Sequence, residues 1–182
     1  MSLQHLIIML LLNPKDLLWW NRVACYLLSF ALIVQFFHYT EHVAQVYQHW
    51  WHRLPIKESG GILYFLNLEW NHLIFNGIYL ILLSLTCIAY VILKKGSPPP
   101  LSSLQAILFL IGTTILIQGY HVIEHIIRVS MHLKTGCEPC PGILGTFVDG
   151  IYLHFTFNTI VFFLPLIAAF ILLRNRPQVD HY

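Results

Sequence analysis

The sequence predicts an all-α integral membrane protein with four transmembrane helices, preceded by a short N-terminal interfacial helix. Of its 182 residues, 57% are hydrophobic and only 10% are charged, and the mean hydropathy is +0.68. Soluble domains carry about 25% charged residues, so this composition favours lipid over water as the solvent. Long apolar stretches separated by short polar segments indicate a single membrane domain over residues 1–182.

Four stretches are long enough to cross a bilayer, since a helix rises 1.5 Å per residue and the hydrocarbon core is about 30 Å thick. The predicted spans cover about 23–50, 62–93, 101–133 and 144–173. Lysines and a run of prolines end the second span, and Arg174 follows the fourth. The apolar run Leu6–Leu12 is too short to span and precedes Pro14, so we expect an interfacial helix there.

The distribution of basic residues predicts the orientation of the spans. An even number of spans puts both chain ends on one side of the membrane. That side has the larger set of cations, namely Lys15, Arg22, Lys94, Lys95, Arg174 and Arg176, against Arg53, Lys57 and Lys134 on the other. Because cytoplasmic segments are enriched in Lys and Arg, both termini are expected in the cytoplasm, with outward loops at 51–61 and 134–143.

The polar residues of the first and third helices recur at an offset of 83 positions, as from His38 to His121. The matched residues are Gln35, His38, Glu41, His42 and His49 with Gln118, His121, Glu124, His125 and His132. An offset of 82 matches Asn67, His72 and Asn76 with Asp149, His154 and Asn158. The pattern predicts a tandem duplication of a helical hairpin, with repeat 1 at about 23–93 and repeat 2 at about 101–173. Two parallel copies would be related by an axis along the membrane normal.

These polar residues are predicted to face the interior of the bundle. At 100° per residue, the set on each helix falls on one face. Counted from the cytoplasmic end, His42, His72, His125 and His154 reach similar heights, in the half of the membrane toward the outer leaflet. Ionisable groups in a membrane are costly and normally pair with one another or line a functional site.

A metal ion is the partner that such residues favour. Imidazole and carboxylate both bind first-row metals, and imidazole suits iron, copper and zinc better than calcium or magnesium. The candidate metal ligands are His38, Glu41, His42, His49, Glu69, His72, His121, Glu124, His125, His132 and His154. The sequence therefore predicts a membrane-embedded transition-metal-binding protein.

A di-metal oxidoreductase acting on a lipophilic substrate is the more specific hypothesis. The order Glu41, Glu69-x-x-His72, Glu124 and His154 is similar to the ligand order of soluble ferritin-like di-iron bundles, although Ile151 stands where that pattern has Glu. With no soluble domain, a redox site would need a membrane protein partner or other electron donor. Nucleic acid is not an expected partner, since the net charge is only +2 and the basic residues are spread along the chain.

Three other interpretations stay open. A haem or chlorin held between two histidines, such as His38 with His121, would make the chain an electron-transfer subunit. The glutamates and histidines are also suited to a proton or ion pathway, although the inner halves of the helices are apolar. The polar faces of the helices would equally hold together a non-catalytic accessory subunit of a membrane complex, through interhelical hydrogen bonds worth about 0.6 kcal/mol each.

Cys137 and Cys140 lie in the second predicted outward loop. Their spacing fits a redox pair, a metal clip or a local disulfide, and an outward loop favours the disulfide.

Overall fold

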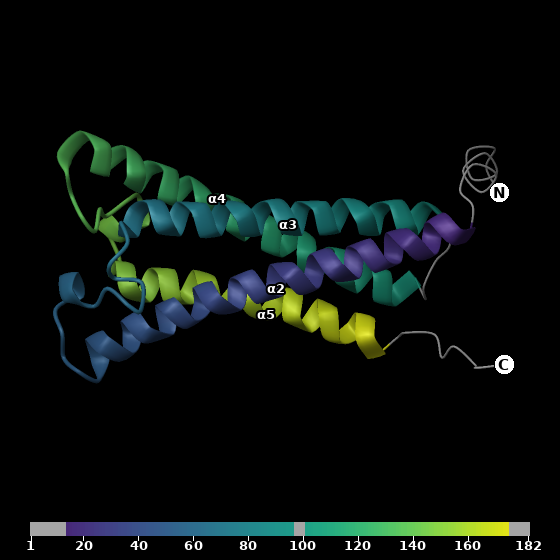
Figure 1. Ribbon diagram of the computed structural model, residues 1–182, viewed down its shortest axis with the longest axis horizontal. Helices are drawn as coiled ribbons and strands as arrows, with labels where there is room; N and C mark the ends of the chain where they lie inside the picture. Colours follow the sequence, from purple (N-terminus) through teal and green to yellow (C-terminus); the bar gives the residue numbers. More distant parts are fainter. Residues whose placement is uncertain (1–13, 97–100, 175–182) are drawn as a thin grey trace.

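The computed structural model describes residues 14–96 and 101–174, and it is an all-α four-helix bundle (Figure 1). Its elements are α2 (Pro14–Trp50), η1 (Ile56–Glu58), α3 (Leu68–Gly96), α4 (Leu101–Thr135), η2 (Leu144–Thr146) and α5 (Gly150–Arg174). The interfacial helix predicted at residues 6–12 lies outside the described residues. The four long helices account for the four predicted spans.

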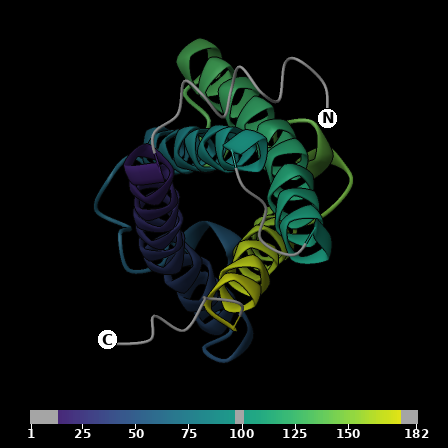
Figure 2. The same ribbon diagram turned by 90° about the vertical axis from the view of Figure 1, so that its right-hand side faces the viewer.

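The helices form a closed ring in which each packs against the next along the chain, and α5 returns to α2 (Figure 2). The start of α2, the end of α3, the start of α4 and the end of α5 lie at one end of the bundle. The two connections that contain η1 and η2 lie at the other end, on the left of Figure 1. Short connections at alternate ends give antiparallel neighbours, as in other up-and-down bundles.

All four helices are long and apolar enough to span a membrane. The candidate spans have mean hydropathies from 1.6 to 2.3, and they are Arg22–Trp50, Glu69–Ile92, Ser103–Thr135 and Gly150–Arg174. Large apolar side chains such as Leu116 and Phe170 lie exposed on the outer surface, whereas histidines, glutamines and asparagines are buried inside. This inverted distribution of polarity suits lipid as the surrounding medium and supports a multi-pass membrane protein.

The helix starts differ from the predicted boundaries at two corresponding places. The second and fourth spans were expected from about residues 62 and 144, but α3 begins at Leu68 and α5 at Gly150. Asn67 Oδ1 accepts the backbone N–H of Trp70 at 3.1 Å, and Asp149 Oδ1 accepts that of Ile151 at 3.0 Å. Side chains of this kind cap helix N-termini, so the apolar residues just before them belong to loops.

An apolar core fills the half of the bundle that lies away from the η1 and η2 loops. Small residues such as Ala24, Ala31 and Ala168 are fully buried there. Within this core, the Tyr79 hydroxyl donates a 2.6 Å hydrogen bond to the carbonyl of Val161. That carbonyl lies four residues before Pro165, which is inside α5 and has no N–H to donate. Tyr79 of α3 therefore replaces the helical hydrogen bond that Pro165 removes.

This replacement predicts that Tyr79→Phe lowers stability by about 1–3 kcal/mol, because a buried carbonyl loses its donor. Thermal unfolding of the purified protein in detergent measures the loss. Tyr26→Phe, at a residue 73% exposed, is the matched control and should change little. In a Pro165→Ala background, a backbone N–H is restored and the Tyr79→Phe penalty should shrink; an undiminished penalty would contradict the explanation.

Candidate metal centre

The first cluster of candidate ligands joins α2 and α3. His38 and His42 are one helical turn apart, which places both on the same face, and their Nε2 atoms lie 3.3 Å apart. The ring of His72 lies 5.2 Å from that of His38 and 4.9 Å from that of His42, centroid to centroid. One nitrogen of each imidazole lies within 4.8 Å of the other two, and all three side chains are buried.

The second cluster joins α4 and α5 with the same pattern. His121 and His125 are again one turn apart, with their Nε2 atoms 3.2 Å apart. His154 supplies the third imidazole, 5.2 Å from His121 and 4.8 Å from His125 between ring centroids. These ligand atoms also lie within 4.8 Å of one another and are buried. We call the two clusters the first triad (His38, His42, His72) and the second triad (His121, His125, His154).

The two triads adjoin each other inside the bundle. The ring of His72 stacks on that of His125 at 5.5 Å, and His42 lies 6.0 Å from His154, again between centroids. All four helices therefore contribute to one group of six buried imidazoles. A tetrahedral ion held by three such nitrogens would have a fourth coordination position open, as in catalytic zinc sites. Among the described residues, only the two triads bring three candidate ligand atoms this close together.

Buried amides connect the helices that carry the triads. Asn76 Nδ2 donates to the His72 carbonyl at 2.8 Å, and Asn158 Nδ2 donates to the His154 carbonyl at 2.9 Å. Gln118 Nε2 donates to Asn76 Oδ1 at 2.7 Å, and Gln35 Nε2 donates to Asn158 Oδ1 at 2.8 Å. The two glutamines thus link α4 to α3 and α2 to α5. Hydrogen-bonded supports of this kind hold a site's geometry before any ligand binds.

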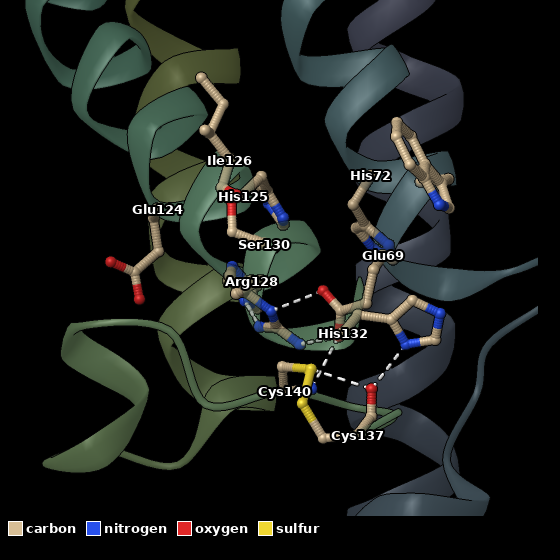
Figure 3. Close-up of polar contacts among 12 residues, drawn as sticks. Glu69, His72, Glu124, His125, Ile126, Arg128, Ser130, His132, Cys137 and Cys140 are labelled. Atoms are coloured by element: carbon tan, nitrogen blue, oxygen red, sulfur yellow. Dashed lines mark hydrogen bonds and ion pairs between the residues drawn. A yellow bond between two sulfur atoms is a disulfide. The ribbon is translucent and has the colours of Figure 1, made fainter. Parts of the chain in front are cut away.

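Two of the predicted carboxylate ligands instead bind loop backbone. Glu41 accepts the N–H groups of Ile62 at 2.9 Å and Leu63 at 3.2 Å. Glu124 accepts those of Ile143 and Leu144 at 2.8 and 3.0 Å. In Figure 3, Glu124 points toward the loop and away from His125. These carboxylates hold the η1 and η2 connections against the bundle.

The third carboxylate, Glu69, pairs with Arg128. Arg128 Nε and Nη2 donate to the two carboxylate oxygens at 2.9 and 3.0 Å, and Cys140 N–H donates to the same carboxylate at 2.8 Å (Figure 3). Arg128 Nη1 lies against His154 Nε2. Both side chains of the ion pair are buried.

The remaining predicted ligands, His49 and His132, lie closer to the loops. Their Nδ1 atoms contact the carbonyls of Leu54 at 2.8 Å and Cys137 at 2.7 Å. Cys137 and Cys140 form a disulfide, the alternative that an outward loop favoured. The eleven predicted ligands therefore fall into six clustered imidazoles and five residues held by other partners.

The surroundings of the triads differ at one position. His42 Nδ1 lies 2.9 Å from Gln45 Oε1 in the first half, whereas the aligned position in the second half is Arg128, which has no acceptor atom. The Nδ1 atoms of His121, His125 and His154 are buried without a hydrogen-bond partner among the described residues. Buried polar atoms normally have hydrogen-bond partners. The second triad therefore has more ring nitrogens without a hydrogen bond than the first.

A cavity of about 50 Å³ reaches the triads from the loop end of the bundle. It is lined by His72 of the first triad and by His125 and His154 of the second, together with Gln45 and Arg128. Residues of both connections, including Ser59 and Pro139, form its outer part.

A repeated tripeptide explains how the glutamates reach the loops, and the sequence analysis missed it. Gly61-Ile62-Leu63 and Gly142-Ile143-Leu144 are identical. Both glycines have positive φ, at 81° and 70°, a region that favours glycine. A Cβ at Gly61 would overlap Glu41 Oε1, and one at Gly142 would overlap Glu124 Oε1. Searching the loops as well as the helices for repeats would have revealed this motif.

Comparison with known proteins adds no assignment to these residues: no protein-family model, no curated protein and no solved structure matches the chain. Function is therefore argued from the geometry and chemistry of the site itself.

The close approach of carboxylate and glycine predicts that Gly61→Ala and Gly142→Ala each destabilise the protein by about 1–3 kcal/mol, because the new methyl group overlaps a fixed side chain. Thermal unfolding in detergent measures the effect. Gly77→Ala is the control, since a Cβ there meets nothing within 4 Å and alanine is favoured inside a helix by about 0.5–1 kcal/mol. Equal effects of all three substitutions would rule out the glycine–glutamate contact as the cause.

Proposed function

We propose that this protein binds two transition-metal ions inside a membrane-spanning four-helix bundle, one at each triad. The observation that carries the proposal is the pair of buried three-imidazole clusters, each with its ligand atoms within 4.8 Å. Because the triads adjoin each other through His72 and His125, the ions would form one dinuclear centre. The six triad histidines are the proposed ligands, and the glutamates and the two outer histidines serve as structural supports.

The chemistry of the ligands favours copper or zinc. All six are imidazoles, which suit zinc, copper, iron and nickel, whereas magnesium and calcium take oxygen ligands. Non-haem iron sites of the facial-triad type include a carboxylate, but the glutamates near these triads are bound by backbone N–H groups or by Arg128. Copper would support oxidation of a lipophilic substrate with electrons passed to or from a membrane partner, which is the oxidoreductase form of the proposal.

The matched contacts of the two halves support a tandem duplication of the helical hairpin. Each half has a His-x3-His pair, an asparagine bonded to the third histidine's carbonyl, and a glutamate bonded to a Gly-Ile-Leu loop. The glutamines cross over, each bonding the asparagine of the other half. Reciprocal contacts of this kind are expected for two copies related by a two-fold axis along the membrane normal.

Two of the alternatives receive less support from the packing. A haem or chlorin needs a flat space between its axial histidines, and ligand pockets of that class measure roughly 300–1,000 Å³, whereas the cavity beside the triads is about 50 Å³. A proton pathway needs a polar route through the whole bundle, but a buried apolar core that includes Leu28, Leu83 and Ile111 fills the opposite half. An accessory subunit with bound metal remains compatible with the proposal.

For orientation, we propose that both termini face the cytoplasm and that the η1 and η2 connections face outward, on the basis of the positive-inside bias. The disulfide between Cys137 and Cys140 supports this placement, because disulfides persist in oxidising compartments.

The metal proposal predicts about two metal ions per chain in protein purified from metal-replete cells. His42→Ala removes one ligand of the first triad, and the content should fall to about one ion per chain. The double variant His42→Ala, His125→Ala damages both triads and should hold almost none. Elemental analysis of the purified chains measures the content.

The control for these variants is His52→Ala, at an exposed residue outside both triads, which should keep about two ions. Metal-free wild-type protein from a replete preparation would reject the proposal. An absorption band near 400 nm, typical of haem, would transfer the assignment to the haem alternative.

The orientation predicts that a cysteine at Glu58→Cys, an exposed position in η1, reacts with a membrane-impermeant maleimide in intact cells. The label should attach because the η1 connection faces outward. A variant with the new cysteine near the cytoplasmic end, Arg174→Cys, should react only after the cells are permeabilised. The reverse pattern of labelling would show that the η1 connection faces the cytoplasm and would contradict the proposed orientation.

A further inference from the structure

We propose that the cavity beside the triads binds a small anion of two or three atoms, which bridges the two metal ions and is hydrogen-bonded by Arg128. This inference rests on the proposed function, since the ions are its main partners. It adds an external ligand, a place for that ligand, and a role for an arginine that the metal sites themselves do not require.

Charge balance is the first argument. Two divalent ions held by six neutral imidazoles would bring a charge of about +4 into a membrane interior, where uncompensated charge is costly. The nearby carboxylates are committed to other donors: Glu69 to Arg128, and Glu41 and Glu124 to loop N–H groups. The Glu69–Arg128 pair is itself neutral. Glu41 and Glu124 keep their negative charges, because their backbone N–H partners are neutral, and they offset about half of the +4 from the loop end. The rest is left for an anionic ligand that enters from outside the chain.

The cavity is the second argument, because it connects the outer loops to both triads. It is lined by His72 from the first triad and by His125 and His154 from the second. Its volume of about 50 Å³ is space for about three or four water molecules, at roughly 10–15 Å³ each. An anion of two or three atoms fits this space.

The guanidinium of Arg128 is the third argument. Two of its nitrogens are fixed by Glu69, and Nη1 lies against the ring of His154. Glu69 is in turn held by the backbone N–H of Cys140 (Figure 3). Donors that are fixed in advance stabilise a negative charge without reorganisation. A guanidinium has five N–H donors, so Arg128 keeps two beyond those that face Glu69 and His154, and its side chain lines the cavity next to the second triad.

The ion pair joins the two halves at the α3–α4 interface and has no counterpart among the described residues of the α2–α5 interface. The 83- and 82-residue offsets align Arg128 with Gln45 and Glu69 with Ile151. The uncharged residues at Gln45 and Ile151 show that the hairpin packs without an ion pair at these positions. Arg128 and Glu69 thus form a matched pair at the α3–α4 interface, and the bound anion should be held more strongly on the Arg128 side of the cavity.

The test uses full-length protein in detergent, loaded with Co²⁺, whose visible absorption changes when its coordination changes. Azide is the probe anion. Wild-type protein should bind about two Co²⁺ ions per chain, and azide should shift the Co²⁺ absorption with saturation. The double variant Arg128→Gln, Glu69→Ile copies Gln45 and Ile151 from the equivalent α2–α5 interface and leaves no unpaired buried charge. It should keep its Co²⁺ but bind azide at least tenfold more weakly.

Ser130→Ala, an exposed change on the same helix, is the control and should bind azide like the wild type. Arg128→Lys keeps a cation beside Glu69 but loses the planar guanidinium fork. It is the second variant, in case the double variant does not fold, and it should also lower the affinity for azide. Failure of the wild-type protein to bind Co²⁺ would overturn the proposed function itself. Co²⁺ binding with no azide effect, or unchanged azide affinity in both Arg128 variants, would overturn only the anion site.

Discussion

The burial of polar side chains inside a lipid-facing bundle is the constraint on which the rest of this structure depends. In such an interior, every polar group must find a partner within the chain or in a bound ligand. Gln35 and Gln118 donate hydrogen bonds to Asn158 and Asn76. The Tyr79 hydroxyl donates to the Val161 carbonyl, which Pro165 leaves without a helical N–H partner. Few low-energy arrangements make all of these contacts together, and this restricts how the four helices pack against one another.

The histidines gain their positions from the same network. The asparagines hold the backbone carbonyls of His72 and His154, while the His-x3-His spacing alone places the other imidazoles on one face of α2 and of α4. The result is a group of rings set close together before any ion binds. Metal affinity depends on such preorganisation, because ligands that are already in place lose little conformational freedom on binding.

The two halves differ in which side chain lies beside the histidines at the equivalent positions 45 and 128. Gln45 supports His42 in one half, whereas Arg128 takes the equivalent position in the other and connects the second triad to Glu69 and to the backbone of the disulfide loop. A contact chain therefore runs from the disulfide loop to a buried imidazole through a charged pair. Arg128 and Glu69 keep one another neutral, so this chain crosses the interior without leaving a net charge.

Helical periodicity and the repeated histidines determined the four long helices and included the six clustered imidazoles among eleven candidate ligands, because spacing along a helix is local information. The tertiary structure decided what the glutamates do. Glu41 and Glu124 lie among the histidines in sequence, yet their carboxylates bind the N–H groups of Gly-Ile-Leu loops about twenty residues later. Carboxylates accept from whichever donors the folded chain brings to them, and the positions of loop backbones cannot be read from helix spacing. For the same reason, the starts of α3 and α5 depended on where the loops were held.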